Sequence, residues 1–149
     1  MLDLVLAILH HLLIFTLAGL LAAELALLRP GLGGANLKVL AAIDAGYGAT
    51  AGLILVVGFS RVFLGAKGAD FYLHNPVFWA KIAAFAAVGL LSIAPTVMIL
   101  GWRKRARSEA AFAPSASQVG AARKVLVLEL CVFALIPIFA AAMARGYGL

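Results

Sequence analysis

The chain has 149 residues, of which 65% are hydrophobic and only 12% are charged. About a quarter of the residues of a soluble domain are charged, so this composition excludes an ordinary soluble protein and indicates an integral membrane protein. The single cysteine, Cys131, excludes an intramolecular disulfide and any metal site built from several cysteines. The net charge of +6 is taken as a signal of membrane topology, not of nucleic-acid binding.

Four long apolar segments predict four transmembrane helices, because about 20 apolar residues cross the hydrocarbon core of a bilayer. The spans are expected at residues 2–28, 43–64, 77–102 and 125–143. The connections between them leave little chain for anything else. We therefore expect an all-α integral membrane protein whose residues 1–149 form a single domain, folded as a four-helix bundle.

The first segment carries polar side chains deep within an apolar stretch. Asp3, His10, Leu17 and Glu24 recur every seven residues, which places them on one stripe of a helix. Polar side chains at lipid depth are costly, so they usually face a protein interior, a cavity or a ligand. We therefore predict that His10 faces inward. His11 is rotated by about 100° around the helix, so we regard it as the weaker candidate.

The second segment holds Asp44 near one end and Arg61 near the other. Gly48 and Gly52 form a small-x-x-x-small pair, a spacing that ordinarily lets a neighbouring helix approach closely. The third segment carries Lys81 in its first turns.

The basic residues set the expected orientation. The opposite side of the membrane and its flanking turns have only Arg61, Lys67, Lys81 and Arg145, whereas most basic residues lie in or beside the first and third loops: Arg29, Lys38, Arg103, Lys104, Arg105, Arg107, Arg123 and Lys124. By the positive-inside rule, these two loops are expected in the cytoplasm and both termini outside.

This orientation sorts the polar residues into two layers. The inner layer is acidic and consists of Glu24, Asp44 and Glu129, which we expect to pair with basic residues at the cytoplasmic interface. The alternative is a proton relay through these three residues. The outer layer is rich in imidazole and positive charge: His10, His11, Arg61, His74 and Lys81.

The outer layer suits a haem or porphyrin. A neutral imidazole in an apolar cavity is a natural iron ligand, and helix bundles build cofactor sites from facing side chains. Arg and Lys side chains can pair with propionates. We predict that His10 is the metal ligand of a b-type haem, and that His11, Arg61 and Lys81 also contact the cofactor. The alternatives are that Arg61 and Lys81 snorkel to the interface, and that His10 hydrogen-bonds a neighbouring helix.

Several short stretches resemble the HemJ-type protoporphyrinogen oxidases. The similar stretches are Ala18-Gly19-Leu20 in the first span, residues 50–55, Leu73-His74, Ala80-Lys81, and Glu129 in the last span. The resemblance implies a small helical membrane fold, a b-type haem and oxidation of protoporphyrinogen. It also implies that His10 and Lys81 are the catalytic residues. The chain as a whole resembles a group of short, uncharacterised bacterial four-span membrane proteins, a domain family of unknown function.

We predict a multi-pass protein of the bacterial inner membrane that is in contact with lipid, and we consider three hypotheses for its function. The leading one is a membrane protein that binds haem or porphyrin, with or without HemJ-like oxidoreductase activity. The second is a non-catalytic assembly or scaffold subunit, which associates with itself or with a partner membrane subunit through its glycine faces. The third is a transporter of a small solute, or one coupled to protons, that uses Glu24, Asp44 and Glu129 and works as an oligomer.

Overall fold

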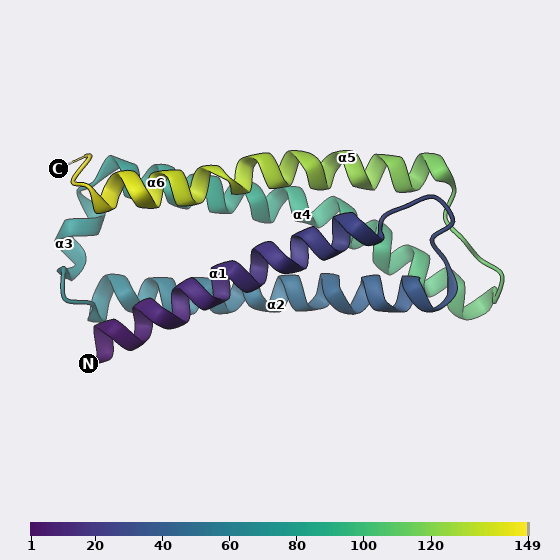
Figure 1. Cartoon of the computed structure of the whole chain (residues 1–149), viewed down its shortest axis with the longest axis horizontal. Helices are drawn as coiled ribbons and strands as arrows, with labels where there is room; N and C mark the ends of the chain where they lie inside the picture. The colour runs from purple at the N-terminus through teal and green to yellow at the C-terminus, as the bar shows by residue number, and fades with distance from the viewer. Residues whose placement is uncertain (149) are drawn as a thin grey trace.

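The computed structural model describes residues 1–148, and every regular element in that range is an α-helix. The helices are α1 (Leu2–Leu27), α2 (Gly34–Leu64), α3 (Gly68–Leu73), α4 (Pro76–Ser108), α5 (Ala116–Phe133) and α6 (Leu135–Ala144). α1, α2, α4 and the joined α5–α6 segment are long and apolar enough to cross a membrane. The expected all-α architecture with four spans is therefore confirmed, and Figure 1 shows both termini at the same end of the bundle.

Three of the four spanning segments extend beyond the expected spans, whereas α1 (Leu2–Leu27) matches its expected span to within one residue. α2 begins at Gly34, whereas the span was expected to begin at residue 43, and α5 begins at Ala116 instead of residue 125. The 31 residues of α2 measure about 46 Å at 1.5 Å per residue, whereas the hydrocarbon core is about 30 Å thick. Apolar composition marks only the part of a helix that fits the bilayer, so the polar continuations were left out of the expected spans.

Local sequence signals account for several helix ends. The side chain of Asn75 caps α4 by accepting a hydrogen bond from the backbone N–H of Val77 (2.8 Å), and Pro76 occupies the first helical position. Ser115 and Gln118 form a capping box at the start of α5. α5 and α6 are separated at Ala134 because Pro137 has no N–H to bond the carbonyl four residues earlier.

The bundle consists of two helix pairs. α1 packs along α2, while α4 packs along α5 and α6; α2–α4 and α1–α5 contacts join the pairs. The core that joins them includes Leu17, Leu21, Leu40 and Leu126, all nearly inaccessible to solvent. Within residues 1–148, α1 does not contact α6. The two pairs therefore separate toward the end that holds the termini, where α3 connects them (Figure 1).

Gly48 and Gly52 of α2 do not pack against a neighbouring helix of residues 1–148, although their spacing suggested that they would. Apart from the neighbouring residues and backbone of α2 itself, a Cβ added to Gly48 or Gly52 would meet no atom of residues 1–148 within 4 Å, so no other helix in that range packs closely against the pair. The close approach occurs instead at Gly46, where a Cβ would lie 3.8 Å from a methyl carbon of Leu20 on α1. Gly48 and Gly52 therefore form a face of small residues on the outside of the bundle.

Candidate functional site

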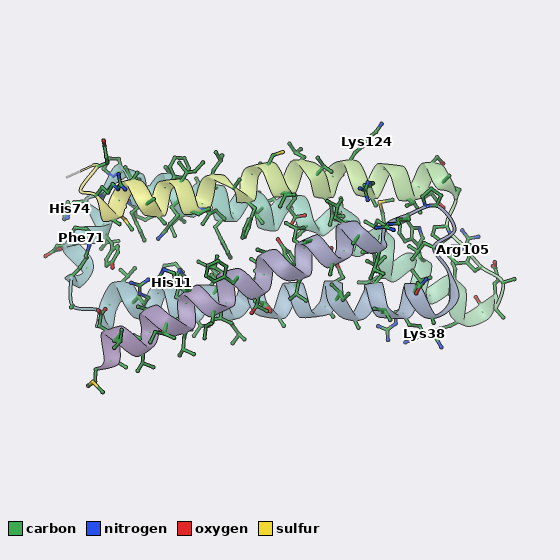
Figure 2. All side chains as sticks on the ribbon, in the orientation of Figure 1. His11, Lys38, Phe71, His74, Arg105 and Lys124 are labelled. Carbon is green, nitrogen blue, oxygen red and sulfur yellow. The ribbon has the colours of Figure 1, made fainter. Side chains whose placement is uncertain are left out.

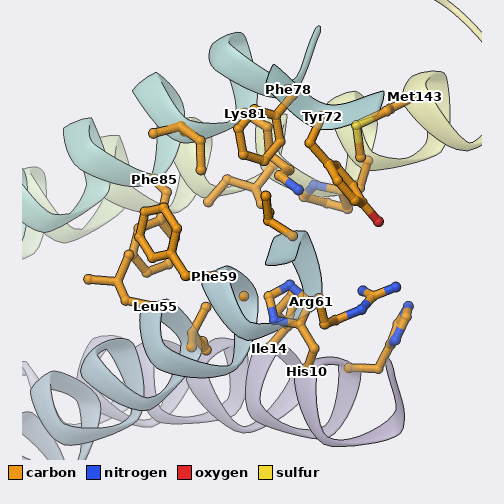
Figure 3. A pocket seen from close by; sticks show the side chains of 18 of the residues that line it. His10, Ile14, Leu55, Phe59, Arg61, Tyr72, Phe78, Lys81, Phe85 and Met143 are labelled. Carbon is orange, nitrogen blue, oxygen red and sulfur yellow. The ribbon is translucent and has the colours of Figure 1, made fainter. Parts of the chain in front are cut away.

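A cavity of about 510 Å³ lies between the two helix pairs, at the end where the termini and α3 are found. This volume is within the usual range of ligand pockets, about 300–1,000 Å³. Its walls are mostly apolar and come from α1, α2, α3, α4 and α6, with Phe133 from the end of α5. Figure 3 shows Phe59, Phe78 and Phe85 around it. The separation of the helix pairs therefore creates a site of ligand size.

His10 projects from α1 toward this cavity, as the sequence predicted (Figure 3). The edge of its ring lies against α2 at Gly58, where an added Cβ would be 3.3 Å from Cε1 of the imidazole. Gly58 therefore provides the room for the ring. Nδ1 of His10 is buried and has no hydrogen-bond partner in residues 1–148. The expected alternative, that His10 bonds a neighbouring helix, is thus not seen in this part of the chain.

His11 is placed differently from its neighbour. It is exposed and contributes to the rim of the cavity, and its Nδ1 lies 2.7 Å from the carbonyl oxygen of Ala7 in its own helix. The rings of His10 and His11 are nearly perpendicular, with centroids 6.4 Å apart. Of the two imidazoles, that of His10 is therefore the one directed into the cavity.

Positive charge gathers at the end of the cavity nearest α3. Arg61 comes from the last turn of α2 and Lys81 from the start of α4, and both line the cavity. Nε of Arg61 is buried without a hydrogen-bond partner in the described residues. The Nζ atom of Lys81 lies 5.2 Å from the centre of the Phe78 ring. The structure thus brings together His10, Arg61 and Lys81, which are distant in the sequence.

Two polar residues of the cavity lining were not predicted as site residues. Lys67 and Tyr72 line it because the connection after α2 folds back as the short helix α3. Tyr72 is only 8% exposed and packs against Phe78, with ring centroids 5.6 Å apart. Consecutive aromatic residues in a supposed loop were the signal that could have revealed this packing. His74, by contrast, is exposed, lies outside the cavity lining of the described chain, and bonds the carbonyl of Asp70 (3.1 Å).

The acidic residues lie on the inside of the bundle, away from the cavity lining. Glu24, Asp44 and Glu129 are 3%, 6% and 1% exposed. The hydroxyl of Tyr47 donates to Oε1 of Glu129 (2.5 Å), and that of Thr96 donates to Oδ1 of Asp44 (2.6 Å).

The expected pairing of these carboxyls with basic residues is wrong for the described chain. Arg123, one of the basic residues beside this acidic layer, donates instead to the backbone carbonyls of Leu25 (2.6 Å) and Leu28 (3.2 Å). A guanidinium at the end of α1 satisfies carbonyls that the helix leaves without partners.

In residues 1–148 no group of three His, Cys, Asp or Glu side chains is arranged to hold a metal ion.

Comparison with known proteins gives a family and no activity. A family model described as "Predicted membrane protein (DUF2214)" matches residues 2–148. No match to the chain is found among curated proteins or among solved structures.

Proposed function

The chain belongs to the DUF2214 family of predicted membrane proteins, and we propose that it binds a b-type haem or a porphyrin in the cavity between its two helix pairs. One observation carries the proposal. The imidazole of His10, whose buried Nδ1 has no partner in residues 1–148, faces the same apolar cavity as the cationic side chains of Arg61 and Lys81.

The chemistry of the lining residues fits this ligand class. A porphyrin is flat and apolar, with acidic groups at one edge. The aromatic and aliphatic walls suit its faces, and Arg61 and Lys81 at the α3 end suit its propionates, which need charge-assisted partners when they leave water. His10 would hold the iron through its imidazole, with His11 at the rim. A bound haem would supply one-electron redox chemistry at this position.

If the protein is an enzyme, we propose that it oxidises protoporphyrinogen as the HemJ-type oxidases do. Its candidate catalytic residues are His10 and Lys81, and the fact that both line one cavity supports the assignment. The reaction removes six electrons and six protons from protoporphyrinogen, and an electron acceptor of the membrane or dioxygen must take them up. Membranes containing the protein are expected to convert protoporphyrinogen to fluorescent protoporphyrin faster than control membranes when such an acceptor is supplied. Lys81→Met should abolish the gain, whereas Lys38→Met, an exposed residue at the other end of α2, should keep it.

We propose the bacterial inner membrane as the location, with both termini outside. The cavity then lies in the outer half of the bilayer, on the side where the positive-inside rule leaves few basic residues. Alkaline phosphatase fused to the C-terminus is active only when it is exported. An inactive fusion that is expressed at normal levels would contradict the orientation.

The absorption spectrum of the purified protein tests haem binding. Protein expressed with an ample haem supply is expected to show a Soret band. His10→Ala should remove or shift that band, while His74→Ala, at an exposed residue outside the cavity, should leave it unchanged. A wild-type protein without a Soret band, or a His10→Ala variant with an unaltered one, would contradict the assignment.

Binding of metal-free protoporphyrin measures the contribution of the cavity to affinity without the contribution of the iron ligand. Because His10 would contribute through iron, His10→Ala should leave the affinity for the metal-free porphyrin within about threefold of the wild-type value. Arg61→Gln and Lys81→Gln should each weaken binding about tenfold, since a charge-assisted hydrogen bond contributes about 1.5–3 kcal/mol. Fluorescence quenching titrations measure both. Binding that is insensitive to both cation substitutions would contradict the proposed placement of the acidic groups.

The outward glycine pair favours a second candidate, an assembly subunit. Gly48 and Gly52 contact no other helix in residues 1–148, so a helix from another molecule could approach there. Gly48→Leu/Gly52→Leu should then abolish oligomers or co-purifying partners detected by native mass spectrometry. Monomeric wild-type protein that carries no partner would exclude this candidate.

A further inference from the structure

We propose that Glu24, Asp44 and Glu129 form a proton-binding site inside the bundle, and that Glu24 is the carboxyl that carries the proton. The site is separate from the cavity and does not depend on porphyrin binding. Its three carboxyls come from three different helices, α1, α2 and α5, which converge where the two helix pairs are in contact.

The burial of the three groups is the first step of the argument. Their side chains are between 1% and 6% exposed. Glu129 accepts a hydrogen bond from Tyr47, which follows Asp44 by about one turn of α2, and α1, which carries Glu24, contacts both α2 and α5. An ionised carboxylate buried without a cationic partner costs several kcal/mol, and like charges nearby add to that cost. Three ionised carboxylates at this position would therefore be strongly unfavourable, and a bound proton relieves the repulsion.

The hydrogen bonds indicate which group holds the proton. Glu129 accepts from the hydroxyl of Tyr47, and Asp44 accepts from the hydroxyl of Thr96. Both carboxyls therefore act as acceptors, which suits ionised oxygens. Glu24 is different, because its Oε1 is buried and has no partner in residues 1–148. A proton on Glu24 removes the charge of the one carboxyl, among these three, whose buried oxygen has no donor in the described residues.

Within residues 1–148, the other polar groups around the cluster do not supply a compensating positive charge. α2 and α4 contribute only the hydroxyls of Tyr47 and Thr96 to its hydrogen bonds. α5 carries Arg123, whose guanidinium is exposed at the surface and donates to the backbone of residues 25 and 28. The three carboxyls are also not arranged as a metal-binding group in the described chain. A proton on one carboxyl lowers the negative charge of the cluster without a cationic side chain.

Infrared spectroscopy of the purified protein in lipid nanodiscs tests the proposal. A protonated carboxyl has a C=O stretching band, separate from the carboxylate bands, that shifts in D2O. We expect this band in the wild-type protein at neutral pH. Glu24→Gln, which keeps the size of the side chain, should remove it. The matched control, Glu109→Gln, changes an exposed residue after α4 and should leave the band unchanged.

Two outcomes would overturn the proposal. The absence of a protonated-carboxyl band in the wild-type protein at neutral pH would show that no carboxyl holds a proton, and this result requires no variant. A band that persists in folded Glu24→Gln protein would show that the proton is held elsewhere. Circular dichroism establishes that the variants are folded, and neither outcome bears on whether the cavity binds a porphyrin.

Discussion

The hydrogen bond between Tyr47 and Glu129 joins α2 of one helix pair to α5 of the other, and its removal should destabilise the bundle measurably. The two side chains are 4% and 1% exposed, and the oxygen atoms are 2.5 Å apart. Tyr47→Phe deletes the hydroxyl and keeps the ring, so it creates no large cavity. Its effect therefore reports the loss of the donor to Glu129.

The expected cost follows from the burial of the acceptor. Hydrogen bonds between membrane helices contribute about 0.6 kcal/mol on average and about 1.7 kcal/mol at most. Leaving a buried acceptor without a donor costs about 1–3 kcal/mol. Because Glu129 is almost completely buried, we expect Tyr47→Phe to lower the free energy of unfolding by about 1–2 kcal/mol.

Reversible unfolding in mixed micelles of a mild detergent and dodecyl sulfate measures this free energy. Tyr147→Phe is the matched control, since that ring is 66% exposed, and it should change stability by less than about 0.5 kcal/mol. Replacing both partners, in Tyr47→Phe/Glu129→Leu, should cost less than the sum of the two single changes. A Tyr47→Phe variant as stable as the control, or strictly additive effects, would refute the reasoning.

Two further predictions use matched pairs. Asn75 is completely buried and caps α4, so Asn75→Ala should lower the free energy of unfolding in the same assay by about 1–2 kcal/mol. Asn36→Ala, at an exposed position, should change this free energy little. Equal effects of the two substitutions would contradict the capping role. Gly58→Ala places a methyl group 3.3 Å from Cε1 of His10 and should displace the imidazole, which weakens haem binding several-fold in a spectroscopic titration. Gly48→Ala, with open space around it, should not weaken binding, and identical affinities for the two variants would argue against haem ligation by His10.

Several features follow from the sequence alone because they depend on local composition and periodicity. The length of each apolar segment is sufficient to indicate a membrane-spanning helix. The seven-residue recurrence of Asp3, His10, Leu17 and Glu24 indicated one inward-facing stripe, and the structure confirms it: Leu17 and Glu24 are buried, and His10 faces the cavity.

The helix ends followed less well from the sequence. Hydropathy marks the part of a helix that lies in lipid, and it does not report where polar residues continue the same hydrogen-bonded helix. This is why α2 and α5 begin earlier than expected.

Only the tertiary structure decided which residues meet across helices, because the rotation and crossing of packed helices depend on every contact along them. It turned Gly48 and Gly52 outward and used Gly46 and Gly58 for close approach. It gave Asp44 and Glu129 hydroxyl partners, where the sequence suggested cationic ones, and it left Oε1 of Glu24 without a partner in residues 1–148. The separation of α1 from α6 is likewise a consequence of how α1 crosses α2, and no property of either segment by itself specifies the cavity that results. Figure 2 shows the side chains that project from all the helices, both into the bundle and away from it.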